Sequence, residues 1–304
     1  MSYSKSIRID GAAALTFWAR LLSVLVLAAF AAACSTTETL RSVQESGMIM
    51  TPPGVDSEKY AALVIDANTG RTLHAVNAES PRYPASLTKM MTMYLLFEAM
   101  DSGRMNGATQ IPVSARAASQ PPSKMRIRAG DSIDADTAVR ALATKSANDV
   151  AAAVGEYLGG SEEQFAAIMT AKARQLGMRR TVFRNASGLG DPGQYTTARD
   201  MAVLGMRLRQ RFPNHFGVFS ATSFDFRGRN VRGHNDMLGR VRGVDGIKTG
   251  YIRDSGFNIV TSVSVDGRKL IVVLMGGKTA RTRNAEVEAL IERFLPLASS
   301  GRTS

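Results

Sequence analysis

The stretch PASLTKMMTMYLLFEAM (residues 84–100) decides how the chain is built around its chemistry. It starts with small and polar residues and then becomes an apolar run, which predicts a helix buried in the core. One turn into this helix stands Lys89, on the same face as Ser86, because residues three apart lie side by side on a helix. An ammonium is unfavourable where apolar side chains are buried, so this lysine needs a partner or a chemical role.

Two further short motifs follow Ser86-x-x-Lys89 in chain order. Residues 146–148 read Ser-Ala-Asn, and residues 248–250 read Lys-Thr-Gly. This ordered set is similar to that of class A β-lactamases and penicillin-binding proteins, in which the middle motif is often Ser-Asp-Asn. A serine-x-x-lysine motif alone carries little information, because both residue types are common, but three motifs in order are far more specific.

The chemistry of the first motif follows from its position. A serine becomes a nucleophile when a neighbouring base takes its proton, and a desolvated lysine can have its pKa lowered enough to act as that base. Ser86 also stands near a predicted helix start, where the helix dipole is positive and backbone N–H groups lack partners. The alternative is that Lys89 reaches the surface and pairs with an acid. The two later motifs favour the reactive pair.

The Ser-Ala-Asn motif falls in a short connection between two predicted helices, residues 134–144 and 149–158. Polar side chains in such a connection can be aimed at a neighbouring element. Ser146 or Asn148 could equally cap the following helix, and both interpretations can hold for the same residues.

The Lys-Thr-Gly motif precedes residues 255–278, two β-branched runs around an Asp-Gly turn that predict a hairpin. The motif itself is therefore expected on an edge-like strand. The ammonium of Lys248 and the hydroxyl of Thr249, beside the small Gly250, suit the binding of a carboxylate next to an extended backbone.

Strand patterns at both ends of the chain enclose a helical middle. Residues 59–80 give two apolar runs around an Asn-Thr-Gly turn, a hairpin, and a last helix is expected over 282–295 with its apolar face toward a sheet. Residues 114–130 are expected to form a loop. The helices expected between the hairpins cover residues 84–100, 134–144, 149–158, 161–176 and 197–209. We therefore predict an α/β fold of the α+β type, with one antiparallel sheet built from both termini and flanked by helices.

Several other kinds of site are absent from the sequence. It contains no HExxH motif, no P-loop, no GxSxG elbow and no GxGxxG after a strand, and we predict neither a metal nor a cofactor. The histidines His74, His215 and His234 are scattered and lack ligand spacing, so each is more often structural or exposed than catalytic. A Ser-His-Asp triad is not supported.

The N-terminus indicates export. Basic residues precede the apolar stretch LLSVLVLAAFAAAC (residues 21–34), whose length suits a signal peptide better than a membrane span of roughly 20 apolar residues. We assign residues 1–33 to a signal peptide and 34–55 to an extended linker. The end of the stretch resembles a bacterial lipoprotein processing site, in which the only cysteine, Cys34, becomes the lipidated first residue and attaches the chain to a membrane. Ordinary signal-peptide cleavage is the alternative. Either route predicts a periplasmic protein.

The chain is strongly basic, with a net charge of +12 over 304 residues. Removal of the signal peptide takes away three basic residues and one acidic residue and leaves +10. Such a charge favours a polyanionic partner such as a cell wall, although it also fits a solvated basic surface. No run of five or more Lys/Arg residues and no zinc-finger or RNP-like motif is present, so nucleic acid is not an expected partner.

Together these stretches resemble the D-alanyl-D-alanine carboxypeptidases, the low-molecular-mass penicillin-binding proteins. The resemblance covers residues 56–297, which we take as the catalytic domain, followed by a tail, 298–304. The blocks that carry it are PASLTKMMT, KSANDVAAAVGEYL, FRNASGLGDPGQYTTARDMA and VDGIKTGYI. It implies a β-lactamase/transpeptidase-like fold and penicillin-sensitive removal of the terminal D-alanine from peptidoglycan stem peptides. β-Lactams would be covalent inhibitors.

The resemblance also implies roles for the catalytic residues. Ser86 would form the acyl-enzyme and Lys89 would accept its proton. Ser146 would relay a proton toward the leaving group, and Asn148 would hold the substrate amide. The family often has glycine at the middle position of this motif, where Ala147 stands, a change small enough to leave these roles intact.

For substrate binding, the resemblance implies that Lys248 and Thr249 hold the terminal carboxylate. Arg283 would assist Thr249, with Arg281 close enough in the sequence to be the alternative. The oxyanion would be bound by the backbone N–H groups of the nucleophile and Tyr251.

Family members with a second, β-rich domain and a C-terminal amphipathic helix continue further than this chain, which ends soon after Leu297. Any membrane attachment is therefore expected to come from the lipidated cysteine.

Three alternatives to a carboxypeptidase are a class A β-lactamase, a D,D-endopeptidase and a non-catalytic wall-binding lipoprotein. A class A β-lactamase deacylates with a glutamate; the glutamates between the last two motifs are Glu156, Glu162 and Glu163, and none begins an ExxLN-like segment. A D,D-endopeptidase that cuts peptidoglycan cross-links would use the same residues. A non-catalytic wall-binding lipoprotein is a third reading, against which the three intact motifs argue.

Overall fold

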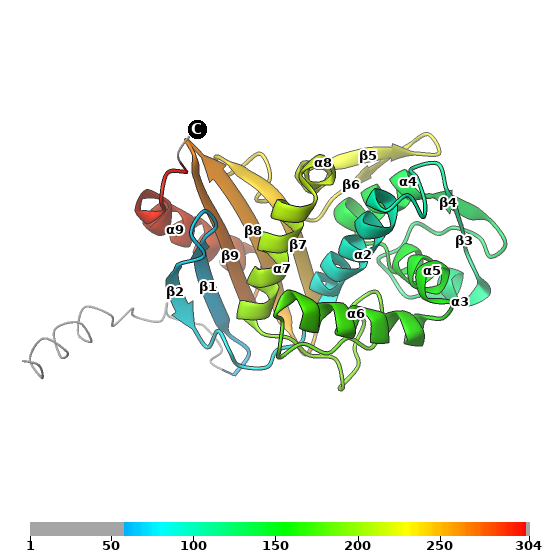
Figure 1. Ribbon diagram of the computed structural model, residues 1–304, viewed down its shortest axis with the longest axis horizontal. Coiled ribbons are helices and arrows are strands. Elements are labelled where there is room, and N and C mark those ends of the chain that lie inside the picture. Colours follow the sequence, from blue (N-terminus) through cyan, green and yellow to red (C-terminus); the bar gives the residue numbers. More distant parts are fainter. Residues whose placement is uncertain (1–57, 302–304) are drawn as a thin grey trace, which may run out of the picture. The chain divides into compact units, whose positions relative to one another are not determined.

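The computed structural model describes residues 58–301, and a five-stranded antiparallel sheet lies on one side of it, beside the helical middle part of the chain (Figure 1). The strands are ordered β2-β1-β9-β8-β7. Their bounds are β1 (Ala61–Asp66), β2 (Thr72–Val76), β7 (Val244–Ile252), β8 (Gly256–Val265) and β9 (Arg268–Gly277). The first hairpin of the described chain thus pairs with the last, which confirms the predicted sheet built from both ends. The expected signal peptide, Cys34 and the whole of the expected linker, residues 34–55, lie outside the described residues.

The sheet is covered on both faces, and its strand sequences show why. In the pairing of β1 with β9, Leu63 lies opposite Val273 and Val64 opposite Val272, and all four are fully buried. Because neighbouring residues of a strand point to opposite faces, the first pair enters one core and the second pair enters the other. This is why β1 reads as a continuous apolar run.

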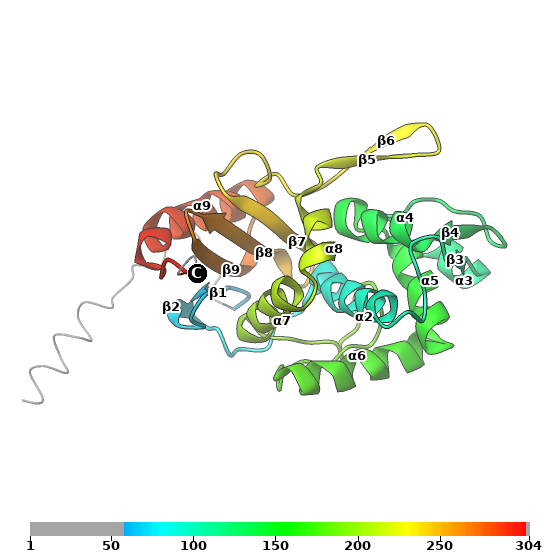
Figure 2. The same ribbon diagram turned by 45° about the horizontal axis from the view of Figure 1, so that its top comes forward.

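Different helices complete the two cores (Figures 1 and 2). Helix α9 (Ala280–Phe294) covers one face of the sheet through residues such as Val287 and Ile291. Helix α7 (Ala198–Arg211) lies on the other face, and α2 (Lys89–Asp101) packs into the same core. Ten of the thirteen residues of α2 are buried, so it is a central helix with core on all sides.

The remaining helices form the helical middle part of the chain and largely match the expected ranges. Thr197 and Ser161 cap α7 and α6 with their side chains, as small hydroxyl residues at helix starts do. The elements are η1 (Ala85–Thr88), α3 (Ala115–Ser119), α4 (Ala135–Arg140), the π-helical η2 (Ala141–Lys145), α5 (Asn148–Gly159), α6 (Glu162–Leu176), α8 (Pro213–Phe216), η3 (Gly217–Ser220) and η4 (Leu295–Leu297).

The structure differs from the predicted local structure in three places. Residues 114–130 are not all loop, because Ser114 caps the short helix α3 by accepting a hydrogen bond from the backbone N–H of Ala117 at 3.0 Å. The helix predicted from Pro84 starts with the 3₁₀ turn η1 and becomes α-helical at Lys89. Two small sheets lacked a clear alternating pattern and were missed: β3 (Gln110–Pro112) with β4 (Ser132–Asp134), and β5 (Ser223–Phe226) with β6 (Arg229–Arg232).

Among residues 58–301, no helix is long and apolar enough to cross a membrane.

Candidate active site

The three sequence motifs meet at one cleft. The 3₁₀ turn η1 at the start of α2 packs against the edge strand β7, and the connection between η2 and α5 lies on the other side (Figure 1). The cleft has a volume of about 540 Å³. Six of the residues predicted for the site line it: Ser86, Ser146, Asn148, Thr249, Tyr251 and Arg283.

Lys89 lies directly beneath this cleft and is fully buried. Its ammonium nitrogen, Nζ, lies 3.2 Å from Ser86 Oγ, 2.7 Å from Asn148 Oδ1 and 2.5 Å from the carbonyl oxygen of Ser187. In the ammonium form each oxygen receives one of the three N–H groups, whereas in the neutral form two oxygens do and the Ser86 hydroxyl can donate to Nζ. The predicted pairing of Ser86 with Lys89 is therefore present, and the surface ion pair considered as the alternative is excluded.

The surroundings of Lys89 favour its neutral form. Burial lowers the pKa of Lys89 well below its ordinary value, because the charged form loses its hydration. The positive charge of Lys248 lowers it further, whereas the carboxylates of Asp149 and Glu162 act in the opposite direction. Burial of Lys89 in the apolar helix α2 is thus the main cause that favours its neutral amine form.

The Ser-Ala-Asn motif does not cap the helix that follows it. The N-cap of α5 is Ala147, with no side-chain capping bond, so the capping interpretation was wrong. Ser146 has a left-handed backbone (φ 59°, ψ 39°), a conformation that costs a non-glycine residue about 1–3 kcal/mol. Its Oγ is buried and has no hydrogen-bond partner among the described residues.

Asn148 is held from two directions. Its Nδ2 donates to the carbonyl of Pro121 at 3.0 Å, and its backbone N–H donates to the carbonyl of Ser123 at 2.7 Å. Its Oδ1 is the atom that accepts from Lys89. Asn148 therefore links the buried amine to the loop that forms one wall of the cleft.

The Lys-Thr-Gly motif lies on β7, the edge strand, as predicted. Lys248 is 2% exposed and donates to the carbonyl of Thr249 at 3.0 Å. Burial, together with the charge of Arg283, lowers the pKa of Lys248 to about 7. Thr249, which carries a hydroxyl group, lines the cleft directly.

The structure distinguishes the two candidate arginines. Arg283 is 3% exposed and lines the cleft, whereas Arg281 is exposed and does not. The guanidinium of Arg283 donates to Asn284 Oδ1 at 2.6 Å and to the carbonyl of Asn258 at 3.1 Å. Burial lowers the pKa of Arg283 to about 10. Tyr251 is more than half exposed at the mouth, with its ring 4.3 Å from that of Phe257.

Two glycines allow backbones to approach Ser86. A Cβ on Gly250 would lie 3.0 Å from the backbone nitrogen of Ser86, so β7 needs glycine there to reach the start of the helix. At Gly188 (φ +86°) a Cβ would lie 1.8 Å from the carbonyl oxygen of Ala85. Any side chain at position 188 would therefore displace the segment that carries Ser86.

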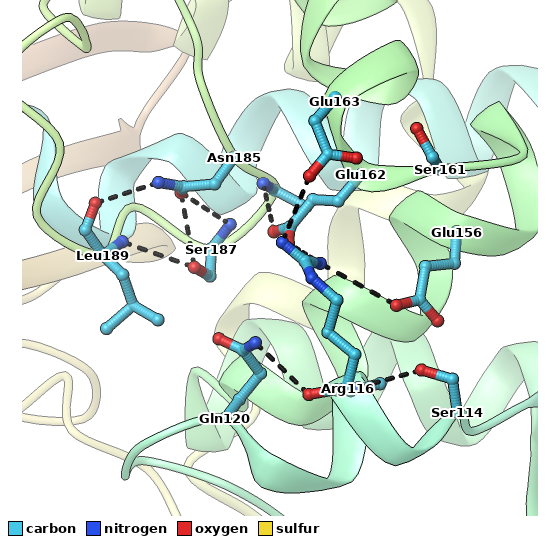
Figure 3. A network of polar contacts seen from close by, with 12 residues as sticks. Ser114, Arg116, Gln120, Glu156, Ser161, Glu162, Glu163, Asn185, Ser187 and Leu189 are labelled. Atoms are coloured by element: carbon cyan, nitrogen blue, oxygen red, sulfur yellow. Dashed lines mark hydrogen bonds and ion pairs between the residues drawn. The ribbon is translucent and has the colours of Figure 1, made fainter.

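The loop 184–189 that holds Lys89 is itself fixed by a polar network (Figure 3). Asn185 Oδ1 accepts from the backbone N–H of Gly188 at 2.7 Å, and its Nδ2 donates to the carbonyl of Leu189 at 3.0 Å. Glu162 Oε1 accepts from the backbone N–H of Ala186 at 3.0 Å, and the same carboxylate pairs with Arg116.

Sequence reasoning missed the residues that support the site. Ser187 acts through its carbonyl, and Glu162 stands in a helix without any motif. Asn258 Nδ2 donates to the carbonyl of Tyr83 at 3.0 Å and fixes the chain just before Ser86. The block FRNASGLG was part of the family resemblance, and only that signal pointed to the loop of Ser187. Among the described residues, no three His, Cys, Asp or Glu side chains lie together as a metal site requires.

The fold and this cleft define a class: the penicillin-binding proteins of transpeptidase-like fold, which carry a serine-x-x-lysine motif at the start of a buried helix. D-alanyl-D-alanine carboxypeptidase DacD of Francisella tularensis superposes with a TM-score of 0.75 at 27% identity, over 82% of this chain and 73% of that one. Penicillin-binding protein D2 of Listeria monocytogenes, solved in its cefotaxime-bound form, gives 0.71 at 28% identity, over 80% of this chain and 98% of that one.

The sequence pattern of the D-alanyl-D-alanine carboxypeptidases, peptidase family S11, matches residues 47–279. The chain belongs to this family of serine peptidases. D-alanyl-D-alanine carboxypeptidase DacA of Escherichia coli (strain K12) is 34% identical over 251 residues. That alignment covers 80% of this chain and 62% of DacA, so the chain spans less than two thirds of the length of that relative.

Gly188→Ala should slow acylation by a labelled penicillin at least tenfold, because the added methyl would push the Ala85 carbonyl and, with it, Ser86 away from Lys89. Gly190→Ala is the matched control, since a Cβ at Gly190 meets nothing within 4 Å. Acylation rates of the two variants at equal folded fraction would test this. Equal rates would contradict the proposed close approach.

Proposed function

We propose that the protein is a D-alanyl-D-alanine carboxypeptidase that removes the terminal D-alanine of peptidoglycan stem peptides through an ester on Ser86. The observation that carries the proposal is the 3.2 Å contact between Ser86 Oγ and the buried Lys89 Nζ at the floor of the cleft. The sequence relationship to D-alanyl-D-alanine carboxypeptidases supports the substrate class.

In the proposed acylation, neutral Lys89 takes the proton of Ser86 Oγ as this oxygen attacks the carbonyl carbon of the penultimate D-alanine. The oxyanion that forms is bound by the backbone N–H groups of Ser86 and Tyr251. Ser146, whose Oγ has no partner among the described residues, relays the proton: it donates its own to the departing amine and receives in its place the proton that Lys89 took from Ser86. The terminal D-alanine leaves, and water then hydrolyses the ester and regenerates the serine.

The terminal carboxylate of the substrate would be bound by Lys248, Thr249 and Arg283. Two buried cations beside one hydroxyl form a strong site for a carboxylate, because charge-assisted hydrogen bonds gain strength away from water. We assign Asn148 first to holding Lys89, since its Oδ1 already accepts from the amine. A contact to the substrate amide would have to be made in addition.

Labelled penicillin should form one stable adduct, and peptide mass mapping should place it on Ser86. Lys89→Ala should acylate roughly 10³-fold more slowly because the general base is gone. Lys172→Ala, which removes an ammonium paired with Glu98 on another surface, should acylate like the wild type. No adduct on the folded protein would favour a non-catalytic wall-binding role. Assays on cross-linked and uncross-linked muropeptides would show whether D,D-endopeptidase activity exceeds carboxypeptidase activity.

The alkaline limb of the pH dependence of kcat/KM should reflect the deprotonation of the Lys248 ammonium. Its pKa of about 7 means that the ammonium is charged below that pH and neutral above it, so carboxylate binding should weaken as the pH rises through about 7. Lys248→Arg keeps the charge to much higher pH and should move the alkaline limb upward. A D-Ala-D-Ala peptide assayed from about pH 5 to about pH 10 would show this. An unmoved alkaline limb would exclude Lys248 as its source.

A further inference from the structure

Apart from the catalytic cleft, the protein has a cavity of about 690 Å³ between the loop 124–131 and the hairpin β5–β6. Seven of the twelve residues that line it are cationic, and one, Asp131, is acidic and pairs with Arg227 at 3.5 Å. The seven cations that line it are Lys124, Arg126, Arg128, Lys145, Arg227, Arg229 and Arg232.

Most of this charge is not neutralised within the protein. Lys124 Nζ donates to the carbonyl of Ala118 at 3.1 Å, and Arg227 forms its ion pair with Asp131. The other five cationic side chains form no ion pair with any carboxylate in residues 58–301. Like charges gathered around one cavity repel each other, and a bound anion would relieve that repulsion.

This cavity, which we call the cationic cavity, adjoins the active site through residues that line both it and its neighbours. Arg232 and Asn230 also line a middle cavity of about 430 Å³, which includes Lys248 and Thr249. The middle cavity in turn shares Gly233, His234, Asp236 and Thr249 with the catalytic cleft. A polymer whose one segment lies in the cleft can therefore place another segment in the cationic cavity.

We propose that the cationic cavity binds peptide carboxylates of a second peptidoglycan strand. This strand lies next to the one whose stem peptide is being hydrolysed in the catalytic cleft. The proposal rests on the proposed function, because it takes peptidoglycan as the substrate polymer. Arginine guanidinium groups bind carboxylates in a two-pronged geometry, and five of the seven cations are arginines. The cavity adjoins the cleft, so it favours the wall polymer itself over an unrelated anion.

The test uses the full chain after acylation by penicillin, so that the catalytic cleft is blocked. Arg128→Glu/Arg229→Glu reverses one exposed charge on each wall of the cationic cavity. Arg140→Glu/Arg207→Glu is the matched control, with the same change in net charge at exposed positions outside all three cavities. Binding to insoluble peptidoglycan would be measured at low and high salt, alongside binding to anionic phospholipid vesicles.

We expect the first variant to bind peptidoglycan about tenfold more weakly than the control at low salt, and the difference to vanish at high salt. Conversion of the wall carboxylates to amides should weaken wild-type binding to the same extent. Equal binding by both variants, or a defect seen only with vesicles, would overturn the proposal. Failure of penicillin to acylate the wild type would instead count against the proposed function.

A second inference comes from the network of Figure 3. Glu162 is 4% exposed and pairs with Arg116, which also lies 3.8 Å from Glu156 and 3.5 Å from Glu163. Through Ala186, the Glu162 carboxylate holds the loop whose next residue, Ser187, accepts from Lys89. The carbonyl of Ala186 is held from the other side by the Thr92 hydroxyl at 2.7 Å.

We infer that Glu162 is a positioning residue for the general base: it fixes the Ser187 carbonyl and sets the electrostatic field at Lys89. The charged groups that bear on Lys89 are Lys248 on β7, Asp149 on α5 and Glu162 on α6. A negative charge favours the ammonium form, so its removal should leave more neutral amine at low pH.

Glu162→Gln keeps an oxygen for the Ala186 N–H but loses the charge. The acid limb of kcat/KM should move to lower pH. Glu162→Ala, which removes the acceptor as well, should also lower kcat. Glu163→Gln is the matched control, because its carboxylate is 75% exposed and contacts the same arginine. An acid limb at the wild-type pH in a folded Glu162→Gln protein would overturn the inference, since a purely structural role predicts that result.

Discussion

The burial of one ammonium sets the requirements for the rest of the structure. Lys89 is out of contact with water, and its three donors are satisfied by oxygens of Ser86, Asn148 and Ser187. These oxygens come from three separate segments of the chain. Each segment must be placed to within a hydrogen-bond length, because a buried donor without a partner costs about 1–3 kcal/mol. The central helix, the π-helical turn before Ser146 and the rigid loop of Ser187 all serve this placement.

A second constraint is the row of buried cations that continues from Lys89. Burial lowers the pKa of both Lys248 and Lys89. The charge of Arg283 lowers the pKa of Lys248 further, and the charge of Lys248 lowers that of Lys89, so each cation disfavours the protonated form of the next. This mutual repulsion favours a neutral amine beside Ser86. It also leaves Lys248 and Arg283 in need of an anion. A substrate carboxylate would meet that need, so the same electrostatics serve base strength and substrate binding.

The elements with strong local signals could be predicted from the sequence. The hairpins at both ends, the central helix and the edge position of Lys248 followed from strand runs, turn residues and helical periodicity. Short elements could not be predicted. A side-chain cap starts the five-residue helix α3, which is too short to show a helical period. In the hairpin β5–β6 only Phe224 is buried and most of β6 is exposed, so no periodic apolar pattern marks it.

The sequence by itself determined the chemistry that is available: a serine one helical turn from a lysine, and two further polar motifs in a fixed order. Only the tertiary structure decided which groups act together. It buried Lys89 completely, brought a carbonyl 98 residues away onto its Nζ, and placed Arg283 rather than Arg281 at the cleft. The physical reason is that backbone carbonyls are the same at every residue, and burial depends on neighbours that are distant in the chain. A sequence names side chains, whereas hydration and electrostatic field arise only once the chain has folded around them.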